Sequence, residues 1–285
     1  MKIIHRHYAF LITVCFAAST LLGQGNSDNY VVSITKSSLR PLAQVEDGSG
    51  AERKELLEEY ARKMNPLTPE LKMSMTLGHY YTGFSTDVLQ INAYESIADA
   101  DQAGENEEKT RERAWRRDDV REEFFKKFNK YLVRGHTDLE MMRVVPGRTK
   151  IRKRKPKENT VVTLTRYYLA PLSDVDGGSA EERKELLDKY FEEVVMNDDK
   201  LLSQIVLSHY WSGELGYGKG WPFVYVREWA SFADAEDSES LAKAREEAWP
   251  DEEERKAAIK RFVEYWSGGI HEDMGIYNNL VNLQK

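Results

Sequence analysis

The residues best suited to chemistry are histidines that occur at matched positions along the chain. Four of the six histidines fall into two recurring contexts: one pair follows Gly78 or Ser208, and the other pair precedes a carboxylate by two residues. An imidazole titrates near neutral pH, so it can act as a general base or bind a metal, and a nearby carboxylate can orient its ring. The candidate catalytic residues are His79, His136, Asp138, His209, His271 and Asp273. The pattern leaves the metal, if there is one, unspecified.

A structural explanation of the same pattern is also open. An internal duplication copies each histidine whether or not it is catalytic, and histidines often satisfy buried backbone groups or stabilise loops. No phosphate-binding loop, serine-centred nucleophile motif or cysteine-based zinc pattern accompanies these histidines in the sequence. The sequence therefore names no reaction and requires no cofactor.

The histidines match because the chain contains two copies of one unit. Val31–Tyr60 aligns with Val161–Tyr190 without a gap, and further along Trp115 corresponds to Trp249. Each unit of about 115 to 125 residues has the size of a small domain rather than that of a solenoid repeat. The expected organisation is a signal peptide at 1–25, a first domain at 26–146, a basic linker at 147–159 and a second domain at 160–285.

The composition limits the class of protein. With 285 residues, of which 41% are hydrophobic and 31% charged, the chain is typical of a soluble globular protein. The net charge is −7 although Arg148–Lys157 holds seven basic residues, so the two units are acidic and nucleic-acid binding is not expected. The basic segment is interpreted as a solvated linker. The alternative is that it binds an anionic lipid headgroup or polysaccharide.

The first 25 residues have the pattern of a secretory signal peptide. Lys2 and Arg6 precede the apolar run Tyr8–Ala18, which is too short for a stable membrane span. The only cysteine, Cys15, lies in that run, so the cleaved chain would have neither disulfides nor thiol chemistry. We expect a secreted or periplasmic bacterial protein without a transmembrane segment after cleavage.

Within each unit, hydrophobic periodicity and turn residues predict the order strand, helix, strand, strand, helix, strand. Ser49, followed three residues later by Glu52, is a capping box at the start of the first helix. In the first unit the expected elements are strands at Tyr30–Lys36, Lys72–Tyr81, Val88–Tyr94 and Leu139–Val145, and a long helix at Glu107–Leu132. This α+β order is that of a ferredoxin-like βαββαβ unit, with both helices on one face of an antiparallel sheet.

Two tandem units of this kind each leave one sheet face uncovered, and the two faces can cover each other. On element order, internal repeat and signal peptide, the chain resembles the dimeric α/β-barrel superfamily, here with both halves fused into one pseudo-dimeric chain. The resemblance implies a small-molecule binder, a cofactor-free monooxygenase or a haem-binding enzyme. Fused haem-binding members place an axial histidine in one half only, whereas the histidines of this sequence match across the halves.

Alternation along the strands separates an apolar face from a mixed face. We predict that the apolar face, with Val32 and Ile34 in the first strand, lies under the helices, so that the mixed faces meet between the sheets. Such a mixed face suits a ligand pocket, although a polar interface with bound water is equally compatible. The predicted ligand-binding residues are Thr35, Asn92, Thr165, Tyr225, Arg227 and Trp229.

Arg227 stands where the first unit has Asn92. A buried cation needs an anionic or strongly accepting partner, so either a more distant carboxylate pairs with Arg227 or the site accepts an anionic ligand. We therefore expect a secreted small-molecule-binding protein, and Arg227 favours an anionic ligand.

Two alternatives are open. One is an oxygenase-like or metal-assisted enzyme that uses the paired histidines. The other is a surface protein-interaction module that uses the aromatic segment Gly216–Phe223. The halves would form a pseudo-dimer within one chain, and a homodimer of whole chains is left open.

Overall fold

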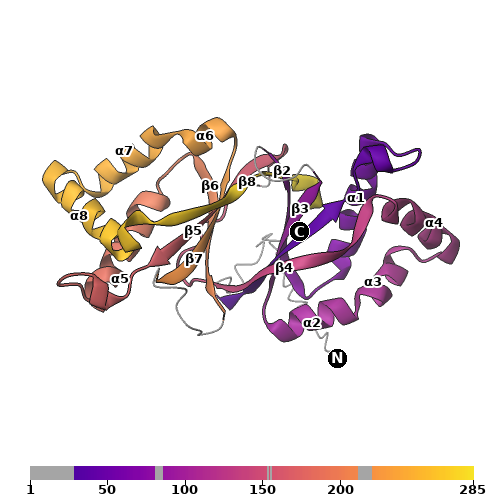
Figure 1. Cartoon of the computed structure of the whole chain (residues 1–285), viewed down its shortest axis with the longest axis horizontal. Coiled ribbons are helices and arrows are strands. Elements are labelled where there is room, and N and C mark those ends of the chain that lie inside the picture. Colours follow the sequence, from indigo (N-terminus) through magenta and orange to yellow (C-terminus); the bar gives the residue numbers. More distant parts are fainter. Residues whose placement is uncertain (1–28, 81–85, 153, 155, 211–219) are drawn as a thin grey trace, which may run out of the picture.

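The computed structural model describes residues 29–80, 86–152, 154, 156–210 and 220–285 (Figure 1). The predicted signal peptide at 1–25 and residues 216–219 of the aromatic segment lie outside this part. The first half contains β1 Val31–Leu39, α1 Gly50–Met64, β2 Leu71–His79, β3 Asp87–Tyr94, α2 Ile97–Glu105, α3 Glu107–Ala114, α4 Asp118–Asn129 and β4 Leu132–Val144. The second half contains β5 Thr160–Leu169, α5 Ala180–Lys189, the π-helical η5 Tyr190–Val195, β6 Leu201–His209, β7 Trp221–Trp229, α6 Phe232–Glu236, α7 Ser238–Ala248, α8 Glu252–Tyr265 and β8 His271–Asn279. Short 3₁₀ turns are η2 Leu42–Gln44, η3 Asn65–Leu67, η4 Leu172–Asp174, η7 Ser267–Gly269 and η8 Val281–Leu283.

The described strands form one closed antiparallel barrel in the order β1-β3-β2-β8-β5-β7-β6-β4. Each half contributes four adjacent strands in the ferredoxin-like order, β4-β1-β3-β2 and β8-β5-β7-β6. The two sheets are joined at both edges, where β2 pairs with β8 and β4 pairs with β6 over three residue pairs each. The helices of each half lie outside its own sheet, so two helical lobes flank the barrel (Figure 1). The chain is thus an α+β protein in which two ferredoxin-like units are fused into a dimeric α/β barrel.

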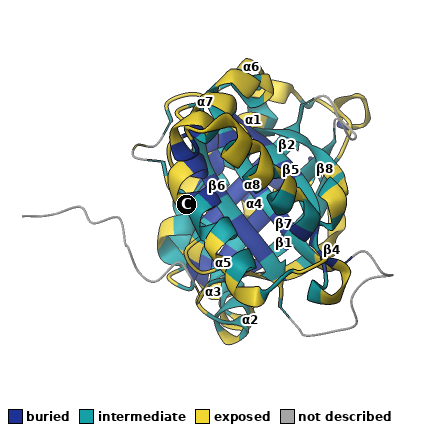
Figure 2. Ribbon diagram, turned by 90° about the vertical axis from the view of Figure 1, so that its left-hand side faces the viewer, coloured by how far each residue is buried: buried dark blue, intermediate teal, exposed yellow. Residues whose placement is uncertain are grey.

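The apolar strand faces point into the barrel, so the prediction that they lie under the helices is wrong. The barrel core consists of Val32, Ile34, Met75, Leu77, Leu89, Ile91, Ala93, Met142, Val144, Val162, Leu164, Leu207, Val224 and Val226. Figure 2 shows buried strands at the centre and exposed residues on the surrounding helices. A closed barrel excludes water from its interior, so it takes the face with the fewest polar groups, and the mixed faces turn outward beneath the helices.

The predicted start of the first helix is confirmed. Ser49 Oγ accepts a hydrogen bond from the Glu52 backbone N–H at 3.1 Å, and in the second half Ser179 Oγ accepts one from Glu182 at 3.0 Å. These bonds satisfy donors that the first turn of a helix otherwise leaves unpaired. The repeat therefore extends to the capping interactions.

The long helix predicted for Glu107–Leu132 is instead two helices, α3 and α4, separated at Trp115. The indole of Trp115 is buried, and its Nε1 donates to Glu59 at 3.2 Å, which holds the chain at this corner. Strand β4 begins earlier than predicted, so His136 and Asp138 lie within the strand rather than in a loop before it.

The basic segment 147–159 contacts the second half at some of its described residues, while others, such as Ile151 and Arg154, are exposed. Lys150 exchanges backbone hydrogen bonds with Gln204 of β6, at 2.8 Å in both directions. Arg152 forms an ion pair with Glu228, which lies on the barrel side of β7 and is only 1% exposed. Arg148 lines a cavity of the second half. Arg148, Lys150 and Arg152 therefore connect the segment to the second half.

None of the helices in the described ranges combines the length and the apolar composition needed to cross a bilayer.

Candidate functional site

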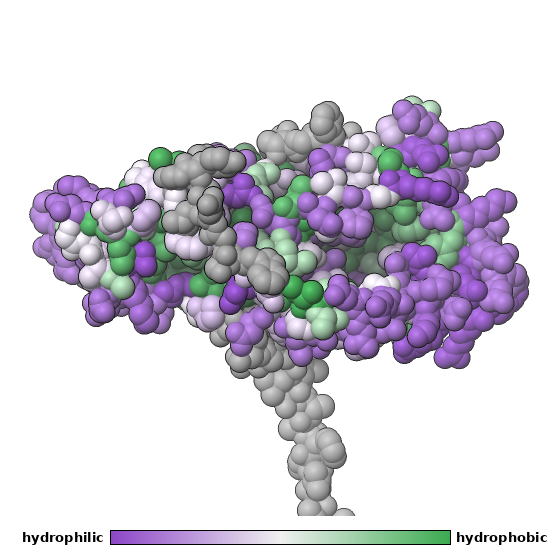
Figure 3. Space-filling view, turned by 60° about the horizontal axis from the view of Figure 1, so that its bottom comes forward, coloured by the Kyte–Doolittle hydropathy of each residue, from purple (hydrophilic) through white to green (hydrophobic). Residues whose placement is uncertain are grey.

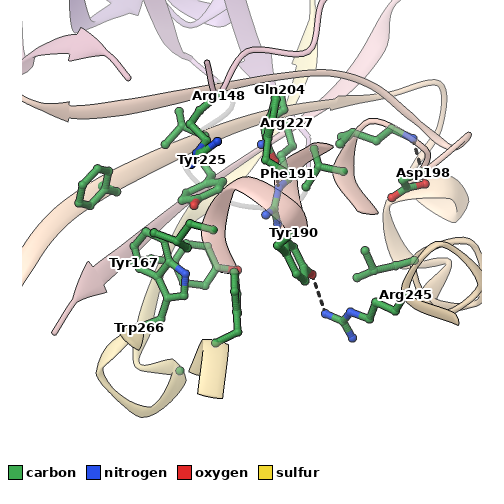
Figure 4. A pocket seen from close by; sticks show the side chains of 18 of the residues that line it. Arg148, Tyr167, Tyr190, Phe191, Asp198, Gln204, Tyr225, Arg227, Arg245 and Trp266 are labelled. Atoms are coloured by element: carbon green, nitrogen blue, oxygen red, sulfur yellow. Dashed lines mark hydrogen bonds between the residues drawn. The ribbon is translucent and has the colours of Figure 1, made fainter. Parts of the chain in front are cut away.

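A cavity of about 540 Å³ lies between the second sheet and the helices that cover it. Outward side chains of β5, β6 and β7 form one wall, and α5, η5, α7 and α8 form the other (Figure 4). The aromatic residues in the wall are Tyr167, Tyr190, Phe191, Phe223, Tyr225, Trp229, Phe262 and Trp266. In Figure 3 hydrophilic side chains cover the helical ends of the molecule, and apolar side chains are seen between them. The volume and the aromatic lining are those of a small-molecule site.

The two halves fill this layer differently. In the alignment that pairs the tryptophans preceding α4 and α8, Phe124 and Phe125 of the first half correspond to Ala258 and Ile259 of the second. The Phe124 ring lies 4.4 Å from the Trp115 ring and is part of a packed aromatic cluster. Replacing two phenylalanines with smaller residues removes volume from the helix layer of the second half. Ile259 is one of the residues that line the cavity.

Arg227 projects from β7 into the cavity wall. Its Nε donates to Oε1 of the buried Gln204 at 2.8 Å, and its guanidinium lies 4.9 Å from the centre of the Tyr225 ring. Within the described residues, no carboxylate lies within 4.0 Å of its guanidinium nitrogens. Arg227 is therefore held by a neutral amide and an aromatic face, not by an ion pair.

Arg245 projects from α7 on the other side of the cavity. It donates to the Tyr190 hydroxyl at 2.8 Å, and its buried Nε has no hydrogen-bond partner among the described residues. Trp266, which also lines the cavity, has a buried Nε1 that lacks a partner in the same part of the chain. The wall therefore contains donors that no described residue satisfies.

Tyr225 of the cavity wall is a neutral side chain rather than a counter-ion. Burial raises the pKa of Tyr225 far above its ordinary value. Its ring packs edge-on against Tyr167, with centroids 5.1 Å apart. Neutral Tyr225 therefore cannot balance the charge of Arg227 at physiological pH.

Three acidic residues also line the cavity. Asp198 is 3% exposed, and its carboxylate accepts from the backbone N–H of Lys200 at 3.1 Å and from the Ser240 hydroxyl at 2.7 Å. Asp237 caps α7, and Glu236 is exposed at the end of α6. Asp198 and Asp237 thus stabilise local backbone, and within the described residues neither forms an ion pair with a cavity arginine.

The predicted ligand-binding residues divide between the halves. Tyr225, Arg227 and Trp229 line the cavity, but it lies between the sheet and its helices, not between the two sheets. Thr165 pairs with Tyr225 in the sheet but is not among the described residues of the cavity wall. The remaining two, Thr35 and Asn92, lie on the corresponding outward face of the first sheet. Placing all six between the sheets was wrong because the barrel interior takes the opposite strand face.

The predicted histidine clusters do not form. His79 and His136 lie on β2 and β4, the opposite edge strands of the first sheet, three strand spacings or about 14 Å apart. Across the halves, His79 pairs with Tyr277, and His271 lies six residues away along β8, about 20 Å at strand spacing. In the second copy, His209 and His271 likewise lie on the opposite edge strands β6 and β8. Across the halves, His209 pairs with Met142, and His136 lies six residues away along β4. The prediction of a shared metal or catalytic site is therefore contradicted by the strand order.

Each histidine on β4 and β8 lies beside the carboxylate two residues further along its strand, and His271 Nδ1 also lies 3.0 Å from the Gly269 carbonyl oxygen. His136 Nε2 lies 3.1 Å from Asp138 Oδ1, and His271 Nε2 lies 3.8 Å from Asp273 Oδ1, all on exposed strand surface. Within the described residues, no group of three or more His, Cys, Asp or Glu side chains is arranged to hold a metal ion. A haem held by an axial histidine does not fit the cavity, because none of the four described histidines lies in its wall.

Sequence reasoning identified only Tyr225, Arg227 and Trp229 of the described cavity wall. It missed residues that the site depends on, namely Tyr190, Gln204 and Arg245, as well as Arg148, which comes from the segment interpreted as a linker. One signal was available in the sequence, namely the change from Phe124 and Phe125 to smaller residues in the second copy. That signal indicates lost volume but does not show where the space opens.

No protein-family model matches the sequence, and no curated protein matches it. Several solved structures have a similar fold. A candidate monooxygenase from Fusobacterium nucleatum is 12% identical with a TM-score of 0.48, and the match covers 88% of this chain and 91% of that chain. A doubly substituted chlorite dismutase from Candidatus Nitrospira defluvii is 9% identical with a TM-score of 0.48, covering 88% and 92%. An anthrone oxidase-like protein is 14% identical with a TM-score of 0.40, covering 89% and 92%. These similarities describe the course of the chain and not its ligand.

Proposed function

We propose that the protein binds a small, largely apolar molecule in the cavity between its second sheet and the helices of the second half. The observation that supports this most is the aromatic cavity of about 540 Å³ in one half, at a layer that the other half fills with phenylalanines. Empty apolar space lowers stability, so a cavity beside a well-filled copy favours a binding role.

Titration with the fluorescent apolar probe N-phenyl-1-naphthylamine tests the proposal. We expect saturable binding of one probe per chain. The double variant Ala258→Phe/Ile259→Phe restores the residues of the first copy, and we expect it to abolish binding because the added rings fill the cavity. Ala257→Phe is the matched control, because Ala257 is exposed on the same helix and its ring would point to solvent.

Two results would contradict the proposal. One is a wild-type protein that shows no saturable binding of the probe. The other is a folded double variant that binds the probe as the wild type does, which would place the probe elsewhere. Circular dichroism of each variant establishes that it is folded.

We further propose that binding takes place outside the cytoplasm, because residues 1–25 have the signal-peptide pattern. Mass spectrometry of the exported protein tests this, and an uncleaved N-terminus would contradict it. An oxygenase-like reaction and a protein-interaction role stay predictions. The binding proposal is independent of the histidines, which lie outside the cavity wall in the described residues.

A further inference from the structure

We infer that the ligand of this cavity is an amphipathic organic anion, whose apolar body packs on the aromatic wall and whose acidic group binds Arg227, with Arg245 as a second donor. This inference rests on the proposed function and names its ligand class. It follows from a comparison of the two halves, which carry the same framework with different charges.

The first difference concerns β3 and β7. In the first half, Asn92 is neutral and its side-chain oxygen accepts a hydrogen bond from the Ser74 hydroxyl at 2.8 Å. In the second half, Arg227 occupies the matching position and brings a positive charge against the neutral Gln204. The sheet side of the second half thus gains a cation without gaining a paired carboxylate in the described residues.

The second difference concerns α3 and α7. In the first half, Arg111 donates to Glu107 at 2.6 Å, and the Tyr60 hydroxyl donates to the same carboxylate at 3.0 Å. This cluster is electrically balanced within the protein.

The second half keeps the tyrosine and the arginine of this cluster but loses its acid. Arg245 still donates to the Tyr190 hydroxyl, at 2.8 Å. The position that corresponds to Glu107 is Leu241, which lines the cavity. No carboxylate lies within 4.0 Å of the Arg245 guanidinium nitrogens in the described part of the chain. Its buried Nε lacks a partner there, as the Nε of Arg111 does in the first half, so the lost carboxylate is the difference between the halves.

Both differences change the charge in the same direction. One adds a cation and the other removes an anion, so among the described residues two arginines without ion pairs line one cavity. The acidic residues of the wall, Asp198, Glu236 and Asp237, form no ion pair with either arginine in this part of the chain. The third cavity arginine, Arg148, is already paired with Asp188. Partly buried cations without counter-ions are costly, and a bound carboxylate, sulfonate or phosphate would offset that cost while accepting two parallel N–H bonds.

The arrangement in Figure 4 suits a ligand with a defined polar end. Arg227 comes from the sheet, Arg245 comes from α7, and in this view the Tyr190 side chain lies between them. Aromatic side chains form much of the remaining wall and would pack on an apolar body. Since the first half has Asn92 and an internally paired Arg111, we expect one anion site per chain.

A pair of probes with the same apolar body separates this inference from the proposed function. 8-Anilinonaphthalene-1-sulfonate and N-phenyl-1-naphthylamine share the anilinonaphthalene body and differ by the sulfonate. We expect the wild type to bind the sulfonate at least about 10-fold more tightly, since charge-assisted hydrogen bonds are the stronger kind. We expect Arg227→Asn, which restores the first-copy residue, to weaken sulfonate binding by about 10- to 100-fold and to leave the neutral probe nearly unchanged.

A second pair of variants tests Arg245 without removing it. Leu241→Glu restores the acid found in the first half, and Leu241→Gln has nearly the same shape without the charge. We expect Leu241→Glu to weaken sulfonate binding about 10-fold more than Leu241→Gln does, because its carboxylate competes for Arg245. This comparison carries the test if Arg227→Asn proves unfolded by circular dichroism.

The outcomes distinguish the two proposals. If neither probe binds the wild type, the proposed function itself is wrong. If the wild type binds both probes with equal affinity, the cavity binds apolar molecules without preference for an anion, and the anion inference is overturned. It is also overturned if folded Arg227→Asn keeps the wild-type ratio of the two affinities and Leu241→Glu binds the sulfonate as tightly as Leu241→Gln does.

Discussion

Replacing Arg152 with methionine should strongly destabilise the protein, because it leaves a buried carboxylate without its cation. The partner, Glu228, also accepts hydrogen bonds from the hydroxyls of Thr160 at 2.6 Å and Ser203 at 2.7 Å, and from the Asn279 amide at 2.9 Å. Among these donors in the described part of the chain, Arg152 alone carries a charge. Methionine preserves much of the side chain's length and apolar contact but cannot donate.

The expected magnitude follows from the burial of the pair. Removing one partner of a buried ion pair costs about 3–5 kcal/mol. Glu228 is 1% exposed, but three neutral donors remain and the Arg152 side chain is 23% exposed, so we expect the lower end, about 3 kcal/mol. At roughly 2–4 °C per kcal/mol for a chain of this size, Tm should fall by about 6–12 °C.

Urea unfolding followed by tryptophan fluorescence, together with Tm, measures this loss. Arg154→Met is the matched control, because Arg154 belongs to the same basic segment and is exposed, so its removal should change the free energy of unfolding by less than about 0.5 kcal/mol. Adding Glu228→Gln to Arg152→Met should restore roughly 1–2 kcal/mol by removing the unpaired charge. Equal stabilities of the Arg152→Met and Arg154→Met variants would refute the reasoning.

Two further predictions concern the start of α5. Hydrogen bonds from Arg261 and Tyr265 lower the pKa of Glu182 to about 2 from its usual 4.5, so the stabilisation is present above pH 4.5 and is lost as the pH falls toward 2. The Tm difference between wild type and Glu182→Gln should therefore shrink over this interval, modestly because the carboxylate is partly exposed, and a constant difference would contradict the assignment. Ser179→Ala should cost about 1 kcal/mol in urea unfolding, since the Ser179 hydroxyl caps the Glu182 N–H at 3.0 Å, whereas a loss as small as that of exposed Ser173→Ala would argue against the cap.

The sequence alone determined the features that depend on local pattern. The repeat, the βαββαβ order and the cap at Ser49 were all readable, because periodicity and capping involve residues close together in the chain. The substitution of Arg227 for Asn92 is also visible from the alignment of the two copies. Alternation likewise sorted each strand into an apolar and a mixed face.

Only the tertiary structure decided where those faces point. Alternation defines two faces but not which one closes the barrel, and closure placed Val32 inside and Arg227 outside, beneath the helices. The strand order then kept His79 and His136 on opposite edges of their sheet, although their matched positions had suggested a shared site. A cavity and an arginine without an ion pair depend on volumes and distances between residues far apart in the chain, and these exist only once the helices have packed on the sheet.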